Sequence, residues 1–68
     1  MISITHNDDD IQVPENLNIW KFLEFMNVKH PKYVVVELNG DILSQKEWET
    51  TFIKENDDIS HDYLAGGG

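Results

Sequence analysis

The 68-residue chain contains no cysteine and no arginine. Without cysteine there can be no disulfide, no thiolate metal site and no cysteine nucleophile, so the fold must be held by its core alone. Five lysines stand against thirteen Asp and Glu residues, giving a net charge of −8. The basic stripe that nucleic-acid binding needs is therefore missing. An acidic small protein suits a basic groove on another protein, although the same charge also serves solubility.

Long apolar runs are missing too. No stretch approaches the roughly 20 residues that a bilayer span requires. Met1–His6 has no basic segment followed by an apolar run, so it does not read as a signal peptide. The lack of cysteine is typical of a reducing compartment. We therefore expect a cytoplasmic protein that is monomeric on its own and has no membrane partner.

Glycine is scarce, and three of the four glycines, Gly66, Gly67 and Gly68, stand together at the end of the sequence. Without a Cβ, such residues form a slim and flexible string that can approach other surfaces closely. The string is either a frayed end or a working part that carries an ionised carboxylate. We expect a folded domain over residues 1–65 and a flexible tail over residues 66–68.

The first half of the chain predicts a hairpin followed by a helix. Apolar and polar residues alternate over 2–6, a turn-forming run covers 7–10, and a second strand covers 11–13 before Pro14. Asn18 suits a helix N-cap. The helix should end before Pro31. Trp20 and Phe25 lie off its buried stripe, either at the edge of the core or exposed to a partner. That stripe has helical spacing and consists of Ile19, Phe22, Leu23 and Met26.

The second half predicts further strands. The β-branched run 33–38 suits a central strand, and Asn39-Gly40-Asp41 suits a tight turn into a short extended segment. A helical turn over 45–48 would place Trp48 as an anchor, and Asn56 suits a left-handed turn position before a last strand over about 59–64. The order predicts an α+β fold, the ubiquitin-like β-grasp, in which a small mixed sheet of four to five strands packs on one helix.

In these landmarks the chain resembles the thiamine-pathway sulfur carrier (ThiS) family. The resemblance extends over essentially the whole chain. It rests on ordered spacing: Val36–Ile42 with its Leu-Asn-Gly turn, then Trp48, then Ile53–Ile59, then the terminal glycines. Three features depart from the family pattern. Asn56 replaces a usual glycine, Gly66 replaces a common alanine, and Ser60-His61-Asp62 makes the last strand unusually polar.

The resemblance implies a carrier that is not itself an enzyme and binds no cofactor. An E1-like adenylyltransferase of the ThiF type would use ATP and magnesium to adenylate the carboxylate of Gly68. Sulfur from a persulfide donor would then give a thiocarboxylate, and a ThiG-type thiazole synthase would take that sulfur. Gly67 would keep the tail slim and Gly66 would add a hinge. We expect Val35, Tyr63 and Leu64 to contact partners near the tail.

Other functions remain open on the sequence. A molybdopterin-type carrier, or a carrier for another sulfur-containing product, shares the fold, as does a ubiquitin-like interaction module or protein tag. The three histidines and the Asp8–Asp10 run match no EF-hand or zinc spacing, so we expect no metal site. His61, in phase with Ile59, is expected to be a structural histidine. The serines lack a nucleophile elbow, which argues against a hydrolase.

Overall fold

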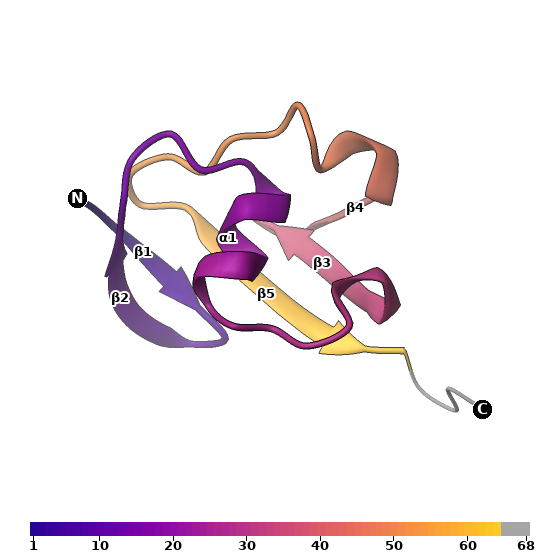
Figure 1. Ribbon diagram of the computed structural model, residues 1–68. Coiled ribbons are helices and arrows are strands. Elements are labelled where there is room, and N and C mark those ends of the chain that lie inside the picture. The colour runs from indigo at the N-terminus through magenta and orange to yellow at the C-terminus, as the bar shows by residue number, and fades with distance from the viewer. Residues whose placement is uncertain (65–68) are drawn as a thin grey trace.

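The computed structural model describes residues 1–64, in which one α-helix packs on a five-stranded mixed sheet (Figure 1). This is the predicted β-grasp arrangement. Two 3₁₀ turns, η1 and η2, lie in the connections. In chain order the elements are β1 (Ile2–His6), β2 (Asp9–Val13), α1 (Ile19–Phe25), η1 (Pro31–Tyr33), β3 (Val34–Leu38), β4 (Asp41–Leu43), η2 (Gln45–Glu47) and β5 (Asp58–Tyr63).

The strand order across the sheet is β2-β1-β5-β3-β4, so the last strand of the chain lies in the middle. β5 runs parallel to β1, where Thr5 pairs with Asp58. It runs antiparallel to β3 and pairs with every residue of β3. Its pairing with β1 covers two positions, whereas its pairing with β3 covers five. In the C-terminal half of β5, β3 is therefore the one described strand that pairs with it.

An asparagine flanks the helix α1 on each side, Asn18 before it and Asn27 after it. The side chain of Asn18 accepts a hydrogen bond from the Lys21 amide at 2.8 Å, which confirms the predicted N-cap. At the other end Asn27 has a φ of 58°, and the Val28 amide donates to the Leu23 carbonyl at 3.0 Å. This is a Schellman termination with asparagine in the left-handed position. The helix thus ends at Phe25, well before Pro31.

The core lies between α1 and the sheet. Trp48 is the largest fully buried side chain, and Trp20 packs on it edge to face at a ring-centroid distance of 4.8 Å. Trp20 is therefore at the core edge, as predicted, whereas Phe25 is 46% exposed. The buried apolar residues are Ile4, Val13, Ile19, Phe22, Leu23, Val34, Val36, Trp48, Ile53 and Ile59.

Two strand boundaries differ from the prediction. The turn of the first hairpin is confined to Asn7 and Asp8, which both have positive φ, so β2 begins at Asp9 rather than at residue 11. Tyr33 belongs to η1 because Pro31 starts a 3₁₀ turn there, and β3 begins at Val34. β3 has a strand on each side, as its apolar run predicts, but the more polar β5 is the middle strand. Within residues 1–64 no helix is long and apolar enough to span a membrane.

Candidate functional site

The Leu-Asn-Gly turn and the Asn-Asp turn, far apart in sequence, meet at the start of β5. The Asn39 side chain donates to the Asp57 carboxylate at 3.1 Å and accepts from the Asp58 amide at 2.9 Å. The other carboxylate oxygen of Asp57 accepts from the Lys54 amide at 2.7 Å. Asn39, Gly40 and Asn56 all have positive φ, as their turn positions require. These residues fix where β5 enters the sheet.

The predicted anchor Trp48 connects η2 with helix α1. It closes η2, whose Ser44 and Glu47 form a capping box. The hydrogen bond from Ser44 lowers the pKa of the exposed Glu47 carboxyl. The Trp48 carbonyl accepts from the Ile19 amide at 3.1 Å, so the backbone at Trp48 is bonded to the first turn of α1. Its Nε1 is buried and has no hydrogen-bond partner among the described residues.

The opposite end of β5 carries the chain toward its tail. The Leu64 amide donates to the Tyr33 carbonyl at 3.0 Å, and the Tyr63 hydroxyl donates to the Lys29 carbonyl at 2.6 Å. These two bonds fix the strand end on η1 and on the segment after α1. Tyr63 and Leu64 are nevertheless 52% and 53% exposed. The predicted residues Gly66, Gly67 and Gly68 lie outside the described residues, as does the predicted domain boundary after residue 65.

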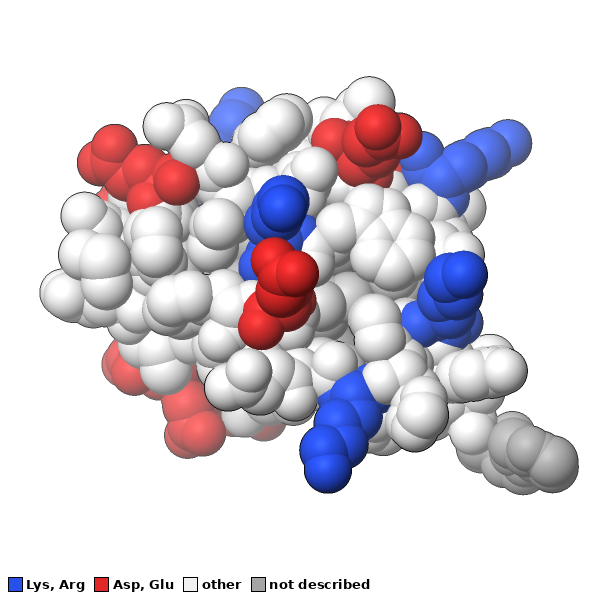
Figure 2. All heavy atoms as spheres, in the orientation of Figure 1, with Lys and Arg blue, Asp and Glu red and all other residues white. Residues whose placement is uncertain are grey.

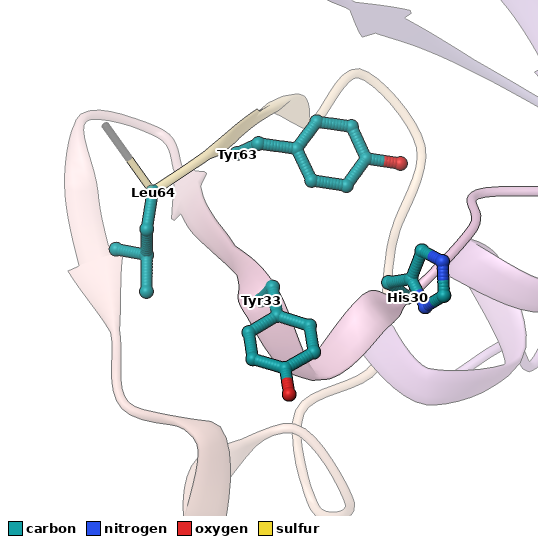
Figure 3. A pocket seen from close by; sticks show the side chains of 4 residues that line it. All are labelled: His30, Tyr33, Tyr63 and Leu64. Carbon is teal, nitrogen blue, oxygen red and sulfur yellow. The ribbon is translucent and has the colours of Figure 1, made fainter. Parts of the chain in front are cut away.

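An aromatic groove lies at this strand end. We use the term tail-root groove for the hollow of about 660 Å³ lined by His30, Tyr33, Tyr63 and Leu64 (Figure 3). Tyr33 is 64% exposed, so the groove presents two tyrosine rings to solvent. The sequence prediction named Tyr63 and Leu64 but missed His30 and Tyr33. Tyr33 was assigned to a strand, and the signal for its exposure was Pro31 two residues earlier, which starts a turn.

The third predicted contact residue lies elsewhere. Val35 alternates with the buried Val34 and Val36, so its side chain is on the sheet face away from α1. It is half-buried and pairs across the strands with Asp62. The same open face carries Glu37, Ile42, Asp58 and Ser60 by register and alternation. The structure therefore groups Tyr63 with Leu64 and places Val35 on a separate, acidic surface.

His61, in the polar middle strand, contacts a second histidine on β1. His6 Nε2 and His61 Nδ1 are 3.0 Å apart, and the ring planes differ by 11°. At this distance one imidazole can donate a hydrogen bond to the other, and the tautomer determines which ring is the donor. His6 also packs edge-on against Phe22 at 5.2 Å. Burial, and then the neighbouring His61, lower the pKa of His6, while Asp9 acts in the opposite direction.

The His6–His61 contact uses one ring nitrogen of each histidine. His30 lies at the tail-root groove, away from the other two histidines. Within residues 1–64 no three His, Cys, Asp or Glu side chains gather in a way that could hold a metal ion. His61 was expected to be structural on the inner face, and its contact with His6 agrees. The sequence did not indicate its partner, although His6 and His61 are each in phase with a buried isoleucine.

The charges are divided between the elements. Every lysine lies outside the strands, on α1, η1, η2 or a connection, and Figure 2 shows lysine side chains projecting on the helix side. The strands contribute acids to the open face instead. From residue 25 to residue 36 the sequence has no Asp or Glu, yet it includes Lys29 and Lys32. The tail-root groove is therefore bordered by the one acid-free stretch of this length in a strongly acidic chain.

Comparison with known proteins agrees with the fold and the landmarks. A crystal structure of the thiamine biosynthesis protein ThiS from Geobacter metallireducens superposes with a TM-score of 0.89 at 33% identity, over 98% of this chain and 100% of that one. A solution structure of a thiamine biosynthesis protein from the same organism gives a TM-score of 0.79 at 32% identity, over 98% of this chain and 88% of that one. No protein of curated function matches the chain in sequence. The ThiS family model matches residues 1–60, and the chain therefore belongs to the ThiS family.

Proposed function

We propose that this protein is a sulfur carrier for thiamine biosynthesis. The observation that carries the proposal is its membership of the ThiS family, supported by the likeness to ThiS structures along nearly the whole chain. The folded domain is the part that the enzymes recognise, and the chemistry takes place on the carboxylate of Gly68. The protein is the substrate of enzymes and not a catalyst.

The proposed reaction has two steps at that carboxylate. A ThiF-type adenylyltransferase uses ATP and magnesium, which belong to that enzyme, to form an acyl-adenylate on Gly68 with release of pyrophosphate. The outer sulfur of a persulfide donor then attacks the acyl carbon and AMP leaves, and a second thiol cleaves the resulting acyl disulfide to give the thiocarboxylate and a disulfide. A ThiG-type thiazole synthase receives the sulfur.

The domain supports this role in two ways. The strand that leads into the tail is the middle strand of the sheet, so its position is set by partners on both sides at its start and by β3 to its end. A slim glycine tail beyond a rigid strand can enter a narrow enzyme channel that a side chain at Gly67 would crowd. Each residue that the enzyme fixes in its channel costs about 1–2 kcal/mol of conformational entropy.

The test is intact-protein mass spectrometry of the full chain. The chain is incubated with ATP, magnesium, a ThiF-type enzyme and a persulfide donor, and an exchange of one oxygen for sulfur is expected. A stable conjugate to a lysine would instead identify a protein tag. An unchanged mass, with a known ThiS protein converted in the same reaction, would exclude the carrier function.

The recipient pathway is tested separately. The thiocarboxylated chain is offered to a thiazole synthase and, in parallel, to a molybdopterin synthase. Sulfur transfer to the thiazole product is expected. Transfer to molybdopterin alone would show that the protein is a carrier for a different product.

A further inference from the structure

We propose that the tail-root groove is a docking site for an acidic, apolar segment of an enzyme that receives the tail. The inference rests on the proposed function, because it assumes that such enzymes bind this chain. It adds a second contact surface, distinct from the acidic open face of the sheet. The occupant is defined by its chemistry: a bulky apolar side chain that fills the groove, with carboxylates beside it.

The first argument is the exposure of apolar surface at a rigid place. Tyr33, Tyr63 and Leu64 are each more than half exposed, and together they line one hollow (Figure 3). Hydrogen bonds to the Lys29 and Tyr33 carbonyls fix both Tyr63 and Leu64. Tyrosines on a preorganised surface are among the residues that contribute most to protein–protein binding. The groove is thus formed before a partner arrives.

The second argument is charge. Lys29 and Lys32 flank His30 in sequence, and the Gln45 side chain of η2, next to Lys46, bonds to the Lys32 carbonyl at 3.4 Å. Among the described residues the one ion pair joins Lys21 to Glu24 at 3.9 Å, so Lys29 and Lys32 form none there. Two of the five lysines, Lys29 and Lys32, therefore lie directly beside residues that line the groove, in a chain of net charge −8. A partner segment with carboxylates complements this surface and is repelled by the rest of the molecule.

The third argument is position. Leu64 is the last described residue before the tail, so a partner in the groove binds this chain directly beside the start of the tail. Once a partner is bound in the groove, entry of the neighbouring tail into the channel of that partner is effectively intramolecular. Binding in the groove therefore raises the local concentration of the tail at the channel of the enzyme.

Two pairs of variants test the docking site. Tyr33→Ala removes an exposed ring, and its control Ile42→Ala removes a side chain that is 68% exposed on the opposite face. Lys32→Glu reverses a charge at the groove, and its control Lys54→Glu makes the same change in net charge at the other end of β5. All four positions are on the surface, and circular dichroism checks the fold.

The measurements are the KM and kcat of the carrier with the ThiF-type enzyme and, separately, with the ThiG-type enzyme. Tyr33→Ala and Lys32→Glu should each raise KM about tenfold with at least one of them, with kcat little changed and both controls near wild type. The Lys32→Glu effect should shrink at high salt. Equal KM values for all variants with both enzymes would overturn the proposal.

Other occupants of the groove give different results. If Tyr33→Ala abolishes a self-association of the wild-type chain in sedimentation, the groove is a contact between two copies. If deletion of residues 66–68 shifts the NMR signals of His30 and Tyr33 in the free protein, the groove holds the chain's own tail. Either result overturns the proposal.

Failure of the proposed function is distinguishable. If the wild-type chain gains no sulfur, the carrier role fails. Binding of the unmodified chain to each enzyme, followed by NMR shifts at Tyr33 and Tyr63, still reports on the groove.

Discussion

The two ends of β5 are built from different chemistry. At its start, hydrogen bonds of the Asn39 side chain join the turn between β3 and β4 to Asp57 and Asp58. At its end two tyrosines and a leucine are exposed, and β3 alone pairs with the strand. The start determines the position of the strand, and the end offers surface to other molecules. We therefore expect substitutions at the first end to change stability and substitutions at the second end to change binding.

The largest effect on function should come from the tail. Deleting Gly68 removes the proposed reacting carboxylate from its normal position, and we expect adenylation and thiocarboxylate formation to vanish while the melting temperature stays that of the wild type. ATP–pyrophosphate exchange with the adenylyltransferase measures the first quantity. Retained activation of the shortened chain would show that the reacting group has been wrongly assigned.

The largest effect on stability should come from Trp48. Trp48→Ala leaves a cavity in the core and should cost about 3–5 kcal/mol of unfolding free energy, much of the total for a small domain. Because this variant is at risk of not folding, Trp48→Phe serves as a milder step in the same direction. Urea denaturation measures both, and Phe25→Ala, at a residue 46% exposed, is the control with a small change. A loss at Phe25 equal to that at Trp48 would contradict the assigned core.

A smaller loss is expected at the start of β5. Asn39→Ala removes two side-chain hydrogen bonds and places alanine at a φ of 53°, for a combined cost of about 1–3 kcal/mol. Asn16→Ala is the matched control, since Asn16 also has a positive φ (65°) but its side chain forms no hydrogen bond with a described residue. The difference between the two variants isolates the hydrogen bonds. Equal losses would mean that backbone conformation alone explains the asparagine.

The smallest effect should be the pH dependence from the histidine pair. The pKa of His6 is lowered in the folded chain from its ordinary value of 6.5, so the unfolded chain binds more protons in the window just below that value. Stability is therefore present above about pH 6.5 and declines as the pH falls toward the folded pKa. Urea denaturation across this range should show the slope, and His6→Phe should reduce it. An unchanged slope in that variant would assign the dependence to other groups.

Much of the fold could be predicted from the residues because each element carries a local signal. The Asn18 cap, the stripe of Ile19, Phe22 and Leu23, and the Asn39-Gly40 turn each depend on neighbours a few residues away. Element ends were less predictable. Helix α1 ends at Phe25 because Asn27 adopts a left-handed conformation, which an asparagine permits but does not require.

The candidate site was predicted less completely because it depends on long-range packing. Tyr63 was expected near the tail, but its neighbours His30 and Tyr33 come from a segment about thirty residues earlier, brought there by the pairing of β3 with β5. The His6–His61 contact has the same origin, since it crosses from β1 to β5. No local pattern in a single sequence contains such a pairing.

The hydrogen bonds of Asn39 also bear on how the protein ages. Asparagine is among the thermolabile residues, and here a glycine follows it, which leaves its amide open to attack by the next backbone nitrogen. Deamidation would turn the donor that lies 3.1 Å from Asp57 into a second carboxylate. Two like charges would then face each other where a hydrogen bond had been. A stored preparation should thus lose the hydrogen bond that positions the start of β5, while the terminal glycines remain chemically intact.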